Sequence, residues 1–385
     1  MKRIVLKYLF SILLPCVYHQ AHAQNLNTSA KAQVNSWATM NFDNPLRYQL
    51  GARFIPELSF ERSQGDLSFD AQFSFNTMGS LDYREWDNTG SFEKFSPYRM
   101  WARVSGTRFV VRLGLQKINF GSAMMLRPLM WFDRIDPRDP LQLTDGVYAL
   151  LGRYYFKNNA NIWFWGLLGN DETKGWEAIP SANKEPEFGG RFQFPLSTGE
   201  MAFSFHHRNA DLDEFYNDTV ALEQQVFSQN RYALDGKWDV GVGLWFEYVL
   251  EHNNIARETY PLQYQHAANI GMDYTFPWGN GLTVSTEFFY VSQSDVLFGS
   301  DINAEVSALS VNYPLGLTDQ ISAIVYYSWE DESWYRFVSL QRTYDYWSFY
   351  LMTFWNPDQF GIYNLEDNRN LFTGEGFQVM TVYNF

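Results

Sequence analysis

The stretch Gly376-Phe-Gln-Val-Met-Thr-Val-Tyr-Asn-Phe385, at the C-terminal end of the chain, places an aromatic or apolar residue at most alternate positions of an extended strand. In water, a terminal strand with an apolar face and an open edge promotes aggregation. The same strand is acceptable when it closes a barrel whose outer surface contacts lipid. We therefore predict a closing strand of a membrane barrel. Its lipid face contains every second residue: Phe377, Val379, Thr381, Tyr383 and Phe385.

The same period of two recurs along the chain, most clearly in residues 67–77. There Leu67, Phe69 and Phe73 alternate with serine, aspartate and glutamine, and no helical face can be drawn through them. We predict eighteen strands, with sixteen as the alternative, in one all-β transmembrane antiparallel β-barrel. The predicted strands are 33–42, 47–62, 67–77, 97–105, 108–118, 146–156, 159–168, 187–195, 200–208, 229–235, 238–251, 263–276, 281–293, 303–313, 320–330, 334–343, 346–355 and 376–385.

The connections between these segments alternate in length, which is the pattern of short periplasmic turns and long extracellular loops. Several short ones carry turn chemistry, such as Asp235-Gly236 and Asn280-Gly281. The predicted short turns are 63–66, 106–107, 157–158, 196–199, 235–237, 277–280 and 344–345. The predicted long loops include 79–96, 119–145, 169–186, 209–228 and 356–375.

Residues 1–23 have the pattern of a cleaved signal peptide. Basic residues flank an apolar run, 4–17, and Ala21-His22-Ala23 supplies a small-residue cleavage site. The expected mature domain, 24–385, contains no cysteine and therefore no disulfide or thiolate metal site. Loss of Lys2, Arg3 and Lys7 takes the net charge from −14 to −17. Such a charge argues against nucleic acid as a partner.

The composition also favours a membrane barrel over a soluble β-protein. Aromatic residues make up 18% of the chain, yet its mean hydropathy is −0.33. Many aromatic residues without long apolar runs are typical of strands that alternate between lipid and lumen. A soluble β-sandwich or propeller also alternates, but it needs fewer aromatic residues because it hides them in a core.

The terminal phenylalanine strand, the alternating segments and the 119–145 loop resemble the Gram-negative outer-membrane porin-like β-barrels. The resemblance implies a protein of the cell outer membrane that contacts lipid and lipopolysaccharide. It also implies insertion by the barrel-assembly machinery, with Phe385 and Tyr383 as the assembly signal. The implied function is a channel for passive diffusion of small polar or charged solutes.

With the apolar faces assigned to lipid, several charged residues are predicted to face the lumen. A basic wall on one hairpin faces an acidic wall seven to nine strands away, and the two would create a transverse field. The alternative is that these charged residues are only the ordinary polar lining that any water-filled barrel needs. The predicted basic wall consists of Arg99, Arg103, Arg108 and Arg112. The predicted acidic wall consists of Glu247, Glu251, Asp273 and Glu287.

The 119–145 loop combines an apolar half with a charged half. A loop exposed to water has no reason to contain so many Met, Leu, Trp and Phe residues. We predict that it folds into the barrel and presents its charges at a constriction, as the constriction loop of porins does. An external cap or a surface for a partner protein is the alternative. The charged residues are Arg127, Asp133, Arg134, Asp136, Arg138 and Asp139.

The sequence contains no motif for catalysis or for a cofactor. The four histidines of the mature chain form no metal pair by spacing, and no G-x-S-x-G motif occurs. The acidic stretch 211–218 could hold calcium, but its spacing is not that of an EF-hand. We therefore predict no enzyme, cofactor or metal. The rival function is a non-transporting barrel subunit of an outer-membrane assembly or secretion complex, with envelope proteins as partners.

Overall fold

The computed structural model describes residues 26–42, 45–85, 87–170, 172–212, 226–256, 262–357 and 372–385. These residues form one 18-stranded antiparallel sheet. No helix among them is long and apolar enough to cross a membrane. The strands are β1 (Leu26–Asn41), β2 (Arg47–Gln64), β3 (Leu67–Arg84), β4 (Asp87–Ser105), β5 (Phe109–Gln116), β6 (Val147–Tyr155), β7 (Asn161–Leu167), β8 (Glu187–Leu196), β9 (Gly199–Asp211), β10 (Val226–Asp239), β11 (Gly243–Asn254), β12 (Tyr264–Phe276), β13 (Leu282–Ser294), β14 (Ile302–Pro314), β15 (Asp319–Ser328), β16 (Ser333–Thr343), β17 (Trp347–Trp355) and β18 (Glu375–Asn384).

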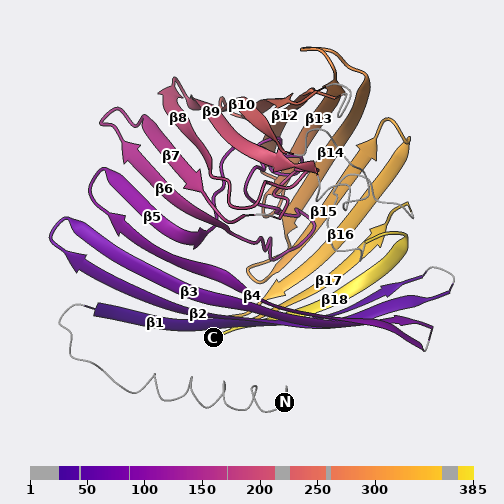
Figure 1. The fold of residues 1–385 in the computed structure, drawn as a ribbon. Helices are drawn as coiled ribbons and strands as arrows, with labels where there is room; N and C mark the ends of the chain where they lie inside the picture. The colour runs from indigo at the N-terminus through magenta and orange to yellow at the C-terminus, as the bar shows by residue number, and fades with distance from the viewer. Residues whose placement is uncertain are drawn as a thin grey trace.

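The sheet closes on itself, because β1 pairs with β2 along one edge and with β18 along the other. In the closing pair, Val34 lies opposite Tyr383 and Met40 opposite Phe377. Figure 1 shows the resulting ring of tilted strands. The prediction of an antiparallel barrel of eighteen strands, rather than sixteen, is confirmed. The predicted signal peptide, 1–23, lies outside the described residues.

Alternation along β3 places apolar side chains on the outside of the barrel, as predicted. Phe69 and Phe73 are exposed on the outer face, whereas Ser74 and Asn76 are buried on the inner face. An apolar outer band is stable only against hydrocarbon. Closure leaves no strand edge without backbone partners, which is the condition for a sheet to cross a membrane.

The prediction of a long loop at 79–96 is wrong. β3 and β4 continue through this region as one hairpin, with Gly79 opposite Glu93 and Arg84 opposite Asp87. The extended hairpin is visible on the right of Figure 1. Its stretch 87–91, Asp-Asn-Thr-Gly-Ser, is polar and rich in turn-forming residues, so it lacked the alternation that marks a strand at the membrane surface.

The predicted turn at 235–237 is also wrong, since β10 runs through it to Asp239. Asp235 is buried and forms a bidentate ion pair with Arg191 of β8. Gly236 is required for packing rather than for a turn, because a Cβ atom there would lie 2.5 Å from the Trp238 ring. The chain instead turns at Gly241, which has a φ of 91°.

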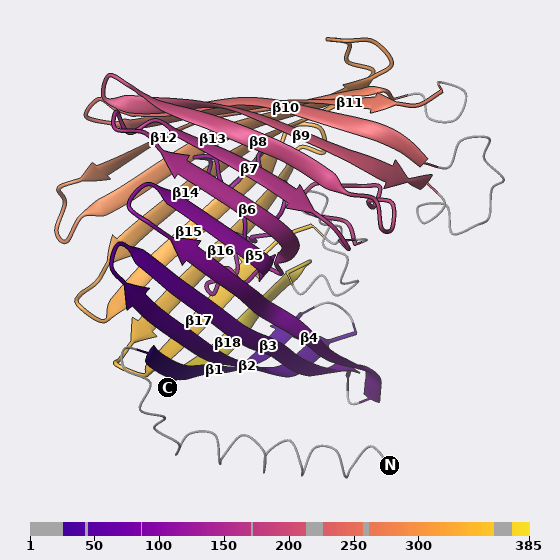
Figure 2. The same cartoon turned by 60° about the vertical axis from the view of Figure 1, so that its left-hand side comes forward.

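The short turns that join β2 to β3, β6 to β7, β8 to β9 and β12 to β13 lie at one end of the barrel (Figure 2), and the longer connections that the structure describes, such as 295–301, lie at the other. The connection between β5 and β6 is different, because it runs inside the ring of strands (Figure 1). Its apolar residues form the main buried cluster together with inward-facing residues of β6, β7 and β10–β17. The core of this barrel therefore lies inside it, between a loop and one part of the wall.

Candidate functional site

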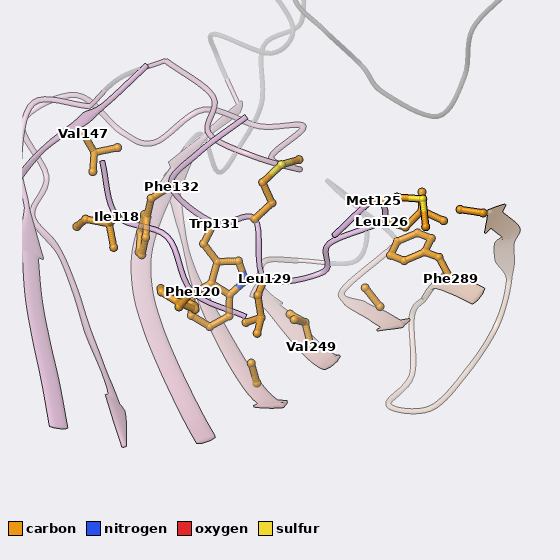
Figure 3. Packing of buried hydrophobic residues seen from close by; sticks show 14 of the residues in the cluster. Ile118, Phe120, Met125, Leu126, Leu129, Trp131, Phe132, Val147, Val249 and Phe289 are labelled. Carbon is orange, nitrogen blue, oxygen red and sulfur yellow. The ribbon is translucent and has the colours of Figure 1, made fainter. Parts of the chain in front are cut away.

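Residues 118–132 of the inward loop lie across the barrel interior and contact two separate parts of its wall. The Phe120 ring stacks on Trp165 of β7, with ring centroids 5.6 Å apart. Farther along, Leu126 is fully buried beside Phe289 of β13 (Figure 3). The apolar half of the 119–145 loop thus packs against the inner face of the barrel, which explains its composition.

Two glutamates of the wall hold the loop through its backbone. The Glu287 carboxylate of β13 accepts hydrogen bonds from the amides of Met124, Met125 and Leu126, at 2.6–3.2 Å. The Glu247 carboxylate of β11 accepts three more, at 2.6–3.2 Å. Its donors are Ser122, Ala123 and Leu129. These charge-assisted bonds satisfy six loop amides inside the barrel.

Glu247 and Glu287 were predicted on an open acidic wall, and this placement is wrong. Both side chains point inward, but each is only 1–2% exposed because the loop covers it. Glu251 forms an ion pair with Arg231 at 2.9 Å. Asp273 lies opposite Gly243, near the turn between β10 and β11. The predicted acidic wall is therefore mostly the attachment surface of the loop.

A second inward segment, 172–186, follows β7 and was not predicted to enter the barrel. The Trp176 indole donates a hydrogen bond to the Arg127 carbonyl at 2.7 Å and stacks on Phe289. Gly175 has a φ of 51°, and a Cβ atom there would lie 1.5 Å from the Met130 carbonyl oxygen. The sequence signals for this were Gly175-Trp176 and the apolar Ile179 in a loop that is otherwise mostly polar.

Several predicted constriction charges are internal ion pairs of the loop rather than groups that face a pore. Arg127 and Asp133 pair at 3.0 Å and are both buried. Burial raises the pKa of Asp133, and the Arg127 guanidinium opposes that rise. Arg138 pairs with Asp136 at 2.7 Å and lies 5.4 Å from the Phe337 ring centroid. The Arg127 and Arg138 guanidinium groups donate hydrogen bonds to acceptors within the same loop.

Arg134 and Asp139, the other two charged residues of the loop, also stabilise its conformation. The Arg134 amide donates to the Thr144 hydroxyl at 2.8 Å, and the Arg134 guanidinium contacts Thr173 of the second inward segment. Burial raises the pKa of Asp139, although the amides of Leu141 and Leu143 donate to its carboxylate and lower it in part. Arg134 thus joins the two inward segments.

Where the second segment meets β8–β11, a balanced network of charges is buried. Glu177 lies 3.0 Å from Arg231, 3.2 Å from Arg208 and 3.4 Å from Lys174. Burial alone would raise the pKa of Glu177, but these three cations outweigh it and lower the pKa. Lys174 also pairs with Glu187 at 2.9 Å. Opposite charges here satisfy one another and fix the segment in place.

The basic wall differs from that network, because its arginines are mostly without acidic partners. Arg99 donates to the Thr144 carbonyl at 2.9 Å, and Arg112 stacks on Trp101 at 4.6 Å. Among the described residues, Arg103 is the one member that forms an ion pair, with Asp70 at 2.9 Å, and its side chain keeps 34% exposure inside the barrel. Arg103 lies directly opposite Arg112. The fourth predicted member, Arg108, is instead exposed in the turn before β5.

Sequence reasoning missed two members of this wall, Arg53 of β2 and Arg153 of β6. Arg53 lies opposite the buried Asn35, and Arg153 stacks on Trp163 at 3.6 Å. On β6 both faces are apolar, because Val147 and Leu151 pack against the inward loop. Apolar alternation therefore could not tell the lumen face from the lipid face there. No described carboxylate forms an ion pair with either arginine.

Solved structures of outer-membrane proteins, a porin among them, share this architecture. OccK7 of Pseudomonas aeruginosa is 10% identical with a TM-score of 0.54, over 93% of this chain and 99% of that one. OccAB4 of Acinetobacter baumannii is 7% identical with a TM-score of 0.54, over 94% and 99%. The chain has the fold of an outer-membrane porin. The anion-selective porin of Comamonas acidovorans also matches this porin fold, at 13% identity and a TM-score of 0.50, over 94% and 100%. No family model and no curated protein matches the sequence.

The remaining predicted sites of this porin-fold chain lie at its surface or outside the described residues. Phe385 is exposed, and its ring stacks on Tyr383 at 5.5 Å on the outer face of the barrel. Within the described part of the chain, no group of three or more His, Cys, Asp or Glu residues is arranged to hold a metal ion. The acidic positions 213–218 lie outside the described residues.

Proposed function

We propose that the protein is an outer-membrane channel for passive diffusion of small polar or charged solutes, and that it favours anions. The porin fold supports the channel, and the apolar outer band supports a location in lipid. The proposal includes contact with outer-membrane lipid and lipopolysaccharide, and insertion by the barrel-assembly machinery. It assigns the protein no catalytic activity and no cofactor.

The observation that carries the anion preference is the basic wall, defined here as Arg53, Arg99, Arg103, Arg112 and Arg153. Among the described residues, these five arginines form one ion pair, Arg103–Asp70. Glu247 and Glu287 do not balance it, because they bind the loop. Glu57 and Asp145 lie near Arg99 but form no ion pair with it, and Asp145 pairs with Lys94. Unbalanced inward charge in a space with low-dielectric walls attracts counterions. The net charge of the whole chain does not cancel this field, since charges are screened beyond about 8 Å at physiological salt.

The rival function is a closed barrel that serves as a subunit of an envelope assembly. The two inward segments favour it, because residues 118–132 and Trp176 pack tightly inside the barrel. Conductance in planar bilayers separates the two functions. Steady open current supports the channel, and no current from a folded, heat-modifiable barrel supports the scaffold.

The anion preference is tested by the double variant Arg112→Gln/Arg153→Gln. It should shift the zero-current potential in a salt gradient toward cations. The shift should be larger at 0.01 M than at 1 M salt, because the screening length falls from about 30 Å to about 3 Å. The matched control, Arg108→Gln/Lys157→Gln, removes two positive charges from exposed turns. Equal shifts in the two double variants would contradict the proposal.

A further inference from the structure

A cavity of about 260 Å³ lies between the inward segments and the inner faces of β10–β16, away from the basic wall. Its deeper part is apolar and partly aromatic. Trp176 stacks on Phe289 there, with ring centroids 5.8 Å apart and an angle of 18° between the planes. Trp131, Ala267 and Val306 complete this part. Such a surface fits a flat or short apolar group.

The rim of the cavity is polar and acidic. Nearer the end of the barrel with the long loops, the wall contributes Glu251 and Gln265. Glu251 follows Val249 by two residues on β11, and Gln265 precedes Ala267 by two residues on β12. The connection between β15 and β16 adds a further pair of carboxylates, which are exposed. They belong to Glu330 and Asp331.

The carboxylates of the rim differ in their partners. Glu251 is neutralised by Arg231, which also pairs with Glu177 in the buried network described above. Asp331 accepts a hydrogen bond from the Ser328 hydroxyl at 3.3 Å. No described cation forms an ion pair with Glu330 or Asp331. The rim therefore has two negative charges to offer a ligand.

We propose that this cavity binds a small organic cation, with its apolar body between Trp131, Trp176 and Phe289 and its charged group at Glu330 and Asp331. The volume is below the roughly 300–1,000 Å³ of pockets that hold drug-sized ligands, so the body is a single ring or a short chain. The site is separate from the arginines to which the channel function is assigned.

The test is fluorescence titration of the full, detergent-folded protein, since Trp131 and Trp176 report directly on the cavity. The probes are 2-phenylethylammonium, 3-phenylpropionate and 2-phenylethanol, which share one ring and differ in charge. The ammonium should quench saturably, and the carboxylate should bind at least about tenfold more weakly. Glu330→Gln/Asp331→Asn should weaken ammonium binding by about three- to tenfold and leave the alcohol unaffected.

The matched control is Glu332→Gln, which removes a carboxylate from the same connection but outside the cavity lining. It should bind the ammonium as the unmodified protein does, and Ala267→Leu, which fills the cavity, should bind none of the probes. Equal affinity for ammonium and carboxylate, no saturable ammonium binding, or an equal loss in the control would overturn the proposal. Because binding is measured without a membrane, a silent channel would leave this result unchanged.

Discussion

Replacing Glu287 by glutamine should release the inward loop from the wall. The carboxylate accepts from three consecutive loop amides, and a carboxamide offers one acceptor oxygen and turns an NH₂ group toward another donor. Loss of one charge-assisted bond costs about 1.5–3 kcal/mol, and the buried amide left without a partner costs about 1–3 kcal/mol more. We therefore expect loop docking to weaken by about 3–5 kcal/mol, while the 18-stranded ladder stays closed.

A loss of about 3 kcal/mol raises the undocked population roughly 100-fold. The assay uses the absence of cysteine from residues 24–385. A single Ala123→Cys replacement places a thiol at a loop position that is only 5% exposed. Its labelling by a small thiol reagent should be slow in the parent protein and up to about 100-fold faster with Glu287→Gln. Single-channel current should become larger and noisier in the same variant.

The matched control for this experiment is Glu61→Gln on β2, which removes an exposed carboxylate. It should leave the labelling of Cys at position 123 unchanged. If Glu287→Gln forms a heat-modifiable barrel whose labelling rate also stays within about threefold of the parent rate, the carboxylate is not what holds the loop, and the reasoning from backbone amides is refuted.

Three further outcomes are expected. Gly121→Ala should release the loop as Glu247→Gln does, because Gly121 has a φ of 94° and a Cβ atom would lie 2.4 Å from the Glu247 carboxylate; proteolysis of the loop measures both. Because the pKa of Glu177 is lowered in the folded protein, its ionised carboxylate stabilises the fold fully above about pH 5, and this stabilisation is lost as the pH falls through the folded-state pKa. Trp fluorescence should therefore change on acidification in the parent protein but not in Glu177→Gln. A cysteine at Asp139, which is largely covered, should react slowly with bulky external thiol reagents and readily with small ones; fast bulky labelling would contradict an inward loop.

The sequence predicted the architecture well because lipid and water impose opposite demands on the two faces of a strand. On β3 the outer Phe69 and Phe73 alternate with inner Ser74 and Asn76, and period and phase are both readable. The prediction fails where a strand does not have lipid on one face and water on the other. The 79–96 hairpin passes through a polar stretch, 87–91, that is rich in turn-forming residues, and β6 has an apolar inner face because it contacts the loop.

The candidate site was less predictable, for a different physical reason. The composition of 119–145 indicated an inward loop, but nothing in the sequence indicated that its backbone amides would take Glu247 and Glu287 as acceptors. Backbone donors are the same for every residue except proline, so their partners leave no sequence signal. The buried carboxylates therefore looked like a charged wall, and Arg53 and Arg153 remained hidden.

The attachment of the loop also has a consequence for the order of assembly. Met124 and Glu287 are 163 residues apart in the chain, and Ala123 and Glu247 are 124 apart. Contacts between such distant residues form late, since a long chain segment must be closed before they exist. The part of the loop around Leu126, which packs beside Phe289 of β13, must therefore wait, uncovered, until β11–β13 are in place. An assembly intermediate that ends before β13 should bind a hydrophobic dye that the finished barrel does not.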